Sequence, residues 1–292
     1  MVCGRERKQD RIILFLATSL VEDVAYTWNL RHSATSLAGD IAGNKEIIQF
    51  MNVHKANVSN HAKRLSDYFE MCCFNNIVKF YSVRGYEVEI ENLQAGGYRY
   101  KLSPQGNQEN FSNFKVTKKS KKGELEQFGI YHNLAIQSSH QNDIYSTPDI
   151  SIINYGSIKK DNTHYAAKRS LSYVPNSELV SFCEVKNFQP FPELMFNFIG
   201  IVNELMLPIM KQEQSSTKTK HIAPSLMISG KPNEHAKKIK KSLEARYCIN
   251  IIFDLFGSTN NPFSRDQMRM LKIIQVSEKH RAAIYIEQQL PF

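Results

Sequence analysis

Two short apolar segments of the chain carry three side chains that together could bind a divalent cation and act on a phosphate ester. Asp149 directly precedes the segment 150–153, and Glu184 and Lys186 lie at the end of the segment that begins at Leu179. Residues two apart on a strand point to the same side, so Glu184 and Lys186 share one face. A carboxylate buried in such a segment needs a partner. If the two segments are neighbouring strands, two carboxylates and one ammonium group converge on a site for a hard cation such as Mg²⁺.

The hydrophobic pattern predicts the elements that must position these residues. Helices are expected over Asn57–Arg84, Pro192–Met210 and Asn233–Tyr247. Strands are expected at Tyr86–Glu91, Tyr98–Leu102, Phe128–Gln137, Pro148–Ile153, Leu179–Lys186, Pro224–Ser229 and Ile249–Leu255, with a loop or hairpin over residues 154–176. The alternation of strands and helices in the second half predicts an α/β fold with a mixed sheet flanked by helices.

The order of these residues and elements resembles the PD-(D/E)xK signature of the restriction-endonuclease-like nucleases. Thr147-Pro148-Asp149-Ile150 matches the first part of the signature, and Cys183-Glu184-Val185-Lys186 matches the second. In that superfamily a helix precedes three meandering strands, of which the second carries the Asp and the third carries the acid-x-Lys. A further helix and a fourth strand follow. The resemblance covers residues 57–255, and it requires an insertion in the hairpin between the two halves of the signature.

The resemblance implies roles for the residues of the motif. Asp149 and Glu184 would bind Mg²⁺ or Mn²⁺, and the backbone carbonyl of Val185 would be a further ligand. Lys186 would position the attacking water or help to deprotonate it. These roles agree with the preference of Mg²⁺ for oxygen ligands and with its effect on the pKa of a bound water.

Two further residues acquire candidate roles from the same resemblance. Glu70 lies on the expected leading helix, where many members of the superfamily carry another acidic residue. Gln189 lies just past the motif strand, where some members carry a glutamine that contacts DNA or water. The implied activity is that of a metal-dependent endodeoxyribonuclease in genome defence or repair. A homodimer and a regulatory or motor protein partner are left open.

The composition agrees with a polyanionic partner. The 292-residue chain has a formal net charge of +9, and nucleic acid is the commonest partner of such a protein. Two groups of lysines could contact phosphates without reading sequence, although a solvated face explains either group equally well. They are Lys118, Lys119, Lys121 and Lys122 near the middle of the chain, and Lys237 and Lys241 on the basic helix. The aromatic residues of the motif strands and their surroundings are expected to pack rather than to stack on bases. They include Tyr131, Tyr155, Phe188 and Phe191.

Two other interpretations fit the same sequence. In the first, Glu184 and Lys186 form an ion pair on a strand surface, and Asp149 merely follows a proline in a turn. In the second, the chain is a non-catalytic DNA-binding protein, because Val53–Leu65 resembles the recognition helix of a helix-turn-helix and Tyr98–Gly106 resembles the end of a wing. The sequence has no G-x-x-x-x-G-K-[ST], G-x-S-x-G or H-E-x-x-H motif, so an ATP-driven motor would be a separate partner.

The predicted organisation has three parts. An N-terminal helical extension covers residues 1–56, the nuclease core covers 57–260, and a C-terminal helix and tail cover 261–292. The five cysteines form no C-x-x-C pair and are expected to be buried thiols in a reducing compartment. The apolar run Ile12–Ala17 is too short to cross a bilayer. We therefore expect a cytoplasmic protein that has no membrane segment.

Overall fold

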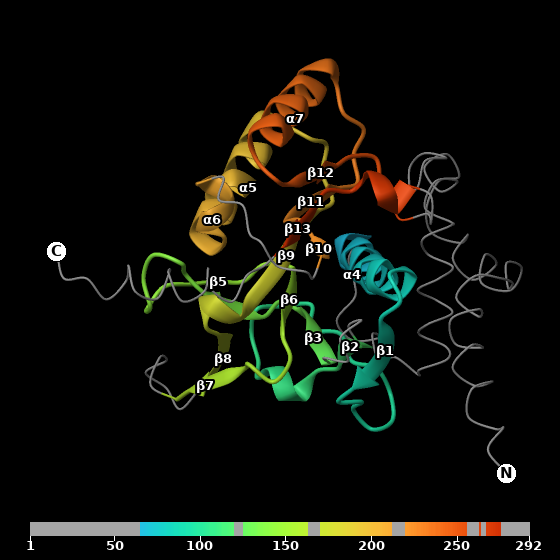
Figure 1. The fold of residues 1–292 in the computed structure, drawn as a ribbon, viewed down its shortest axis with the longest axis vertical. Coiled ribbons are helices and arrows are strands. Elements are labelled where there is room, and N and C mark those ends of the chain that lie inside the picture. The colour runs from blue at the N-terminus through green and yellow to red at the C-terminus, as the bar shows by residue number, and fades with distance from the viewer. Residues whose placement is uncertain are drawn as a thin grey trace, which may run out of the picture.

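The computed structural model describes residues 65–119, 125–162, 170–211, 220–255, 263 and 267–275. Its largest element is a mixed seven-stranded sheet (Figure 1). The strands follow one another across the sheet in the order β1 (Glu87–Glu91), β2 (Asn113–Lys119), β3 (Leu125–His132), β6 (Ile150–Asn154), β9 (Leu179–Lys186), β11 (Ser225–Ile228) and β12 (Asn250–Ile252). The pairs from β1 to β9 are antiparallel, whereas β9, β11 and β12 run parallel.

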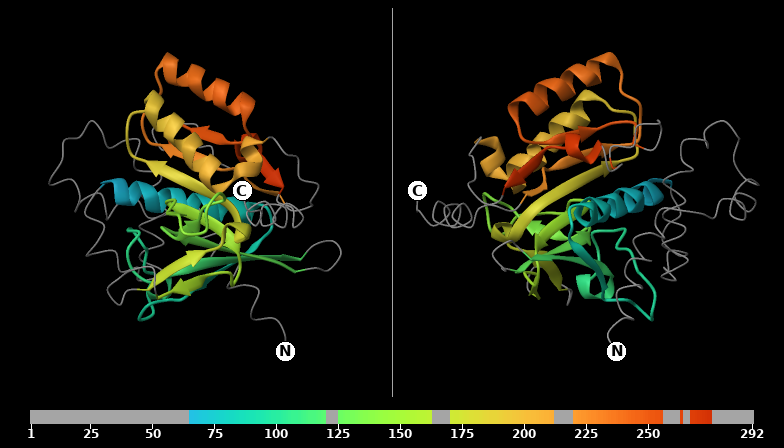
Figure 2. Two further views of the ribbon diagram at one scale, coloured as in Figure 1. Left: turned by 90° about the vertical axis from the view of Figure 1, so that its left-hand side faces the viewer. Right: turned by 45° about the vertical axis from the view of Figure 1, so that its right-hand side comes forward.

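Helices cover both faces of this sheet (Figure 2). Helix α4 (Leu65–Val83) packs on one face, and α5 (Pro192–Leu205) and α7 (Glu234–Arg246) pack on the other. On β9, Val180 and Cys183 belong to the core under α4, whereas Phe182 belongs to the core under α5 and α7. Because β9 is buried on both faces, its sequence is almost continuously apolar. The prediction of a mixed α/β fold with a mixed sheet flanked by helices is therefore confirmed.

Two smaller sheets accompany the large one. The first contains β5 (Tyr145–Ser146), β4 (Ala135–Gln137), β8 (Leu171–Val174) and β7 (Lys159–Asp161), in that order. The second pairs β10 (Lys220–Ile222) with β13 (Ile273–Gln275). The shorter helical elements are α6 (Leu207–Met210) and the 3-10 turns Gln108–Asn110, Asn176–Glu178 and Gln267–Met270. Strands β7 and β8 pair antiparallel within the region that was expected to be a loop or hairpin.

The predictions of two strands are wrong. The segment Tyr98–Leu102 forms no strand in the structure; around Arg99 its backbone bonds instead to the backbone and hydroxyl of Ser112. The segment Phe128–Gln137 is not one strand, because it is divided at Asn133, which has a φ of 45°. A left-handed residue turns the chain, so β3 ends there and β4 joins a different sheet.

The helices differ less from their expected bounds. The helix expected after the motif strand breaks at Met206 and resumes as α6, because Pro208 has no N–H to donate to the preceding turn. Helix α4 ends just before Gly85, whose φ of 80° is the left-handed conformation usual beyond a helix end. The side chain of Asn233 caps α7 by accepting a hydrogen bond from Ala236 N.

Several expectations fall outside the described residues. They include the whole N-terminal extension, residues 57–64 of the leading helix and most of the C-terminal helix and tail. Within that tail, residues 267–275 form a 3-10 turn and β13. Of the helices in the described ranges, none combines the length and apolar character that crossing a bilayer requires. Cys72, Cys73 and Cys183 are buried, whereas Cys248 is exposed.

Candidate active site

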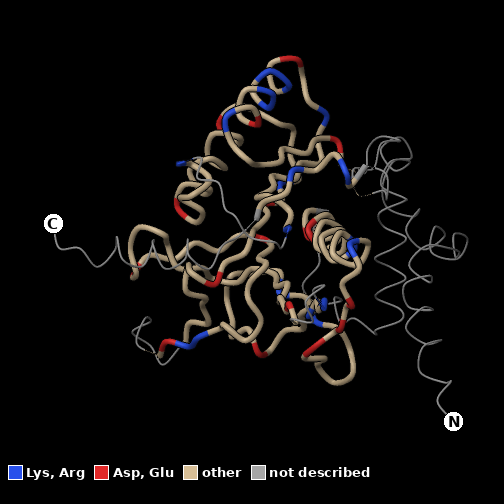
Figure 3. Tube along the Cα trace, in the orientation of Figure 1, with Lys and Arg blue, Asp and Glu red and all other residues tan. Residues whose placement is uncertain are grey.

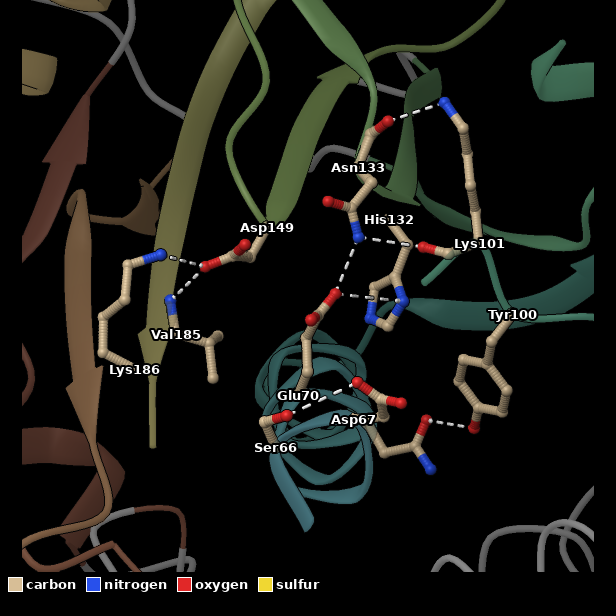
Figure 4. A network of polar contacts seen from close by, with 11 residues as sticks. Ser66, Asp67, Glu70, Tyr100, Lys101, His132, Asn133, Asp149, Val185 and Lys186 are labelled. Carbon is tan, nitrogen blue, oxygen red and sulfur yellow. Dashed lines mark hydrogen bonds and ion pairs between the residues drawn. The ribbon is translucent and has the colours of Figure 1, made fainter. Parts of the chain in front are cut away.

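The acidic residues and the lysine of the sequence motif meet at one edge of the large sheet. Strands β6 and β9 are antiparallel, and Ile150 pairs with Cys183. Asp149, the residue before Ile150, therefore lies beside the end of β9 that carries Glu184 and Lys186. Lys186 Nζ is 2.9 Å from Asp149 Oδ2 and 2.7 Å from Glu184 Oε2. The structure thus brings together the three side chains, which we call the acid–lysine cluster; Figure 4 shows Asp149 with its contacts to Lys186 and Val185.

The cluster is built into the sheet rather than laid on its surface. The backbone N–H of Val185 donates to Asp149 Oδ2 over 2.6 Å, so the carboxylate of Asp149 is held by both backbone and side chain of the motif strand. Glu184 is only 5% exposed. This burial excludes the interpretation of Glu184 and Lys186 as an ion pair on a strand surface.

The charged forms of the carboxylates near Lys186 are unfavourable, because these groups are buried and repel one another. Burial, and after it the charge of Asp149, raise the pKa of Glu184 to about 7. The same two causes raise the pKa of Glu70 to about 8. Burial alone would lower the pKa of Lys186, but the charges of Asp149 and Glu184 raise it above its usual value. Lys186 therefore keeps its proton at neutral pH, and a further cation would relieve the repulsion among the carboxylates.

Glu70 joins this group through Asn133 (Figure 4). It lies in the second turn of α4, and its Oε1 accepts a hydrogen bond from Asn133 Nδ2 over 2.7 Å. The backbone N–H of Asn133 donates to the carbonyl of Asp149 over 3.0 Å. One residue thus holds both a third carboxylate and the backbone of an acid in the cluster. The left-handed conformation of Asn133 allows both contacts, and asparagine tolerates that conformation better than most residues.

Two buried polar residues behind Asn133 were not predicted. Lys101 is 2% exposed, and its Nζ donates to the carbonyl of Asn133 over 2.6 Å. Burial lowers the pKa of Lys101 to about 8. His132 packs edge-on against Phe74 with ring centroids 3.9 Å apart, and its two buried ring nitrogens have no hydrogen-bond partner among the described residues. Burial, and after it Lys101, lower the pKa of His132 to about 3, so the ring is neutral.

We call Glu70, Lys101, His132 and Asn133 the Asn133 network. Its parts come from α4, from the irregular segment after β1 and from the end of β3. The sequence carries only a weak signal for it: a histidine and an asparagine end an apolar strand segment, and a lysine follows two tyrosines in alternation.

The carboxylate oxygens at this edge of the sheet are the type of donor that a hard divalent cation prefers. Among the described residues, no three His, Cys, Asp or Glu side chains are placed so as to hold a metal ion. The ammonium group of Lys186 lies between Asp149 and Glu184 instead. Carboxylate oxygens are nevertheless the ligands that Mg²⁺ and Mn²⁺ prefer, and a cation favours the charged form of a buried carboxylate. Asp149, Glu184 and Glu70 therefore suit such a cation by donor type, but the described side chains are not arranged as a three-ligand site.

The lysines of β2 lie at the far end of the sheet from this site. Strand β3 runs from Leu125 to the site edge at His132, and Lys119 of β2 pairs with Leu125. Seven residue steps of strand, about 23 Å, separate that end from the edge. There Lys118 donates to the carbonyl of Arg84 over 2.6 Å and so satisfies the end of α4, whereas Lys119 is exposed. Outside the described residues lie Lys121 and Lys122.

Other basic residues lie on α7 (Figure 3). Strands β9 and β11 are parallel, so the loop that joins β11 to α7 leaves the sheet at the edge that carries the acid–lysine cluster. Lys237 and Lys241 are exposed on this helix, and Lys237 forms an ion pair with Glu234 at 2.7 Å.

Three of the five residues that follow Lys186 are exposed to solvent, whereas Asn187 is half-buried and Pro190 is buried. Gln189 is exposed, and Phe188 and Phe191 are 62% and 44% exposed. These two rings were expected to pack, but both are largely exposed, because the connection from β9 to α5 passes over the edge of the sheet. The other two aromatic residues singled out in the sequence differ from each other. Tyr131 is buried in the core, whereas Tyr155 is exposed and its ring lies under the ammonium group of Lys115.

Comparison of the chain with protein-family models, with curated proteins and with solved structures gives no match. The helix-turn-helix interpretation rests on residues 53–65, which lie almost entirely outside the described ranges. Residues 98–106, expected as the end of a wing, form no strand. The function must therefore be inferred from the geometry of the site.

Proposed function

We propose that the protein is a metal-dependent nuclease of the PD-(D/E)xK type, with a restriction-endonuclease-like fold, that hydrolyses phosphodiester bonds in DNA. The observation that carries this proposal is the convergence of Asp149, Glu184 and Lys186 at the ends of two adjacent strands. The order of elements supports it, because α4 precedes the antiparallel strands β3, β6 and β9, and α5 and the parallel strand β11 follow. The net charge of +9 supports a polyanionic substrate.

The donors of the site have distinct roles in this proposal. Asp149 and Glu184 would hold Mg²⁺ or Mn²⁺, with Glu70 and the carbonyl of Val185 as further oxygen donors. Such a cation, when bound, neutralises charge on the scissile phosphate and lowers the pKa of a bound water. Lys186 keeps its proton because two carboxylates contact it. It therefore acts by orienting the nucleophile and stabilising anionic oxygen, rather than by accepting a proton.

The basic helix α7 supplies candidate phosphate contacts near this edge. Lys237 and Lys241 are exposed there, and lysine contacts to phosphates give affinity that does not depend on base sequence. The lysines of β2 are poorly placed for the same strand, because they lie at the opposite end of the sheet.

Cleavage of plasmid and linear DNA by the purified protein in Mg²⁺, Mn²⁺ or EDTA tests the proposal. Wild-type protein should cut in either metal and not in EDTA, and Asp149→Ala and Lys186→Ala should not cut. Lys160→Ala is the matched control, because Lys160 is an exposed lysine that also forms an ion pair, with Glu109, outside the site. It should cut like the wild type. Cutting that persists in both site variants would refute the proposed centre.

A further inference from the structure

Two connections meet beside the acid–lysine cluster and form a compact ledge. They are residues 187–191, which follow β9, and residues 229–232, which follow β11. Because the two strands are parallel, both connections leave the sheet at the same edge. Ser229 N donates to the carbonyl of Lys186 over 3.2 Å, and Gly230 N donates to the carbonyl of Phe188 over 3.1 Å. The hydroxyl of Ser229 also donates to Asn187 Oδ1 over 2.6 Å.

The ledge is held so tightly that only glycine fits at position 230. A Cβ atom on Gly230 would lie 2.4 Å from the carbonyl oxygen of Phe188 and 2.7 Å from Gln189 Cα. Both neighbours are backbone atoms, so a side chain could not be accommodated by a rotamer change. Gly230 is braced from the other side as well, since its carbonyl accepts a hydrogen bond from Asp254 N over 3.0 Å.

This fixed ledge presents a large apolar ring to solvent. Phe188 lies two residues beyond Lys186 and is 62% exposed, with Phe191 exposed three residues later. The backbone of Phe188 is held on the ledge by the hydrogen bond that its carbonyl oxygen accepts from Gly230 N. Lys231, the residue after Gly230, is exposed on the same ledge. An exposed aromatic ring and an exposed cation on the same short ledge are the combination that binds a nucleobase together with its phosphate.

We propose that the ledge binds an unpaired nucleotide next to the phosphate that is cleaved, with a base stacked on Phe188 and its phosphate near Lys231. The bases of an intact duplex are stacked on one another, so an aromatic side chain finds a free base face only in a single strand, a flap or a distorted junction. The preferred substrate is therefore DNA with single-stranded character. This inference rests on the proposed nuclease function and adds the class of substrate.

Equilibrium binding in EDTA tests the ledge without requiring any cleavage. The probes are a fluorescent single-stranded oligonucleotide and the duplex of the same length, measured by anisotropy at one salt concentration. Wild-type protein should bind the single strand more tightly than the duplex. Phe188→Ala should weaken single-strand binding about 5- to 150-fold, the usual range for removing one stacked base. Phe188→Tyr keeps the ring and should bind within about twofold of wild type.

Leu125→Ala is the matched control, because Leu125 is also an exposed apolar residue, 54% exposed, but lies at the far end of the sheet. It should leave binding of both probes unchanged. Circular dichroism verifies that each variant folds. The assignment is overturned if Phe188→Ala binds the single strand like the wild type, if it weakens both probes equally, or if neither probe binds.

The ledge and the nuclease proposal fail in different ways. Metal-dependent cutting that Lys186→Ala abolishes, combined with a Phe188→Ala protein that binds normally, would retain the nuclease and remove the ledge. Single-strand binding that depends on Phe188, in a protein that cuts no DNA, would support the ledge proposal and contradict the nuclease proposal.

Discussion

Two lysines lie near the same edge of the sheet, Lys101 buried and Lys186 half-buried, and their surroundings shift their pKa values in opposite directions. In the acid–lysine cluster, Lys186 contacts two carboxylates, and its pKa is raised. In the Asn133 network, Lys101 donates to a backbone carbonyl, and burial lowers its pKa to about 8. The contrast teaches that burial alone lowers the pKa of a lysine, as at Lys101, and that neighbouring carboxylates can outweigh this effect, as at Lys186.

The two regions therefore suit different tasks. An ammonium group between carboxylates stays charged and is available to an anionic phosphate. An ammonium group whose partner is a neutral carbonyl fixes the backbone, here at Asn133, which in turn holds Glu70 and the carbonyl of Asp149. We interpret the cluster as the part that acts on the substrate and the network as the part that positions one of its acids.

Replacing each lysine by methionine is the strongest way to break this comparison. Lys186→Met should lower the cleavage rate about 100- to 1,000-fold, as expected when a donor to a developing anion is lost. Lys101→Met should lower it about 10-fold, because only an outer support of the site is lost. Single-turnover cleavage with saturating Mn²⁺ measures both rates. Equal losses in the two variants would contradict the division between acting and positioning residues.

The pH dependence of the free energy of unfolding of Lys101→Met tests the Asn133 network without any substrate. In the folded chain the pKa of Lys101 is about 8, compared with its usual 10.5. Between these values the unfolded chain binds more protons than the folded chain, so the free energy of unfolding of the wild type rises with pH. Methionine has no proton to lose. The free energy of unfolding of the variant, relative to the wild type, should therefore be highest below pH 8 and fall by up to about 3 kcal/mol by pH 10.5.

Urea unfolding at pH 7, 9 and 10 measures this difference, and the titration of other lysines cancels between the two proteins. Parallel pH curves for wild type and variant would show that Lys101 has an ordinary pKa in the folded chain. The comparison between two oppositely shifted lysines would then be lost.

The cluster could be predicted from sequence, whereas the network could not. Glu184 and Lys186 share a face because they are two apart on one strand, and Asp149 precedes a second apolar segment, so local pattern indicates all three. Lys101 and Asn133 are 32 residues apart, and their contact depends on a segment that forms no strand despite its alternating pattern. Tertiary packing decides such contacts, and periodicity does not report it.

The sheet and its helices were predictable for a similar reason. Burial on both faces gave β9 its apolar run, and one-sided burial gave α5 its helical spacing. The direction of the β2–β3 hairpin was not predictable, and it carries Lys118 and Lys119 to the end of the sheet away from the site. The exposure of Phe188 was missed as well, since composition does not reveal where a connection leaves a sheet.

The pH dependence of Mn²⁺ affinity sharpens the comparison at the carboxylates of the site. In the metal-free chain the pKa of Glu184 is about 7 and that of Glu70 is about 8, compared with the usual 4.5. Raised carboxylate pKa values give stability at low pH that is lost as pH rises from about 4.5 to about 8. A cation binds the deprotonated carboxylates, so it binds more tightly as pH rises through this window and stabilises the folded chain there. The apparent affinity for Mn²⁺ should therefore be about 10-fold or more weaker at pH 6 than at pH 8.

Thermal unfolding with a Mn²⁺ titration at each pH measures this affinity. Glu70→Gln removes one titrating donor and should reduce the pH dependence while leaving some metal binding. A shift in melting temperature that is independent of pH, or none at all, would contradict the assignment of these carboxylates as metal ligands.

The smallest expected effect separates the two functions of Asn133, its backbone conformation and its amide. Asn133→Gly and Asn133→Ala both remove the hydrogen bond to Glu70. Only the alanine variant is destabilised by the φ of 45°, because glycine adopts this conformation without steric strain. Alanine should therefore be less stable than glycine by about 0.5–1 kcal/mol in urea unfolding, and both should weaken Mn²⁺ binding alike. Asn92 is the matched control, because it has a φ of 54° and an amide that bonds only to backbone carbonyls in the described contacts. Its variants should repeat the stability order and leave Mn²⁺ binding unchanged. If the Asn133 variants also bind Mn²⁺ like the wild type, the amide of Asn133 stabilises the fold and does not position Glu70.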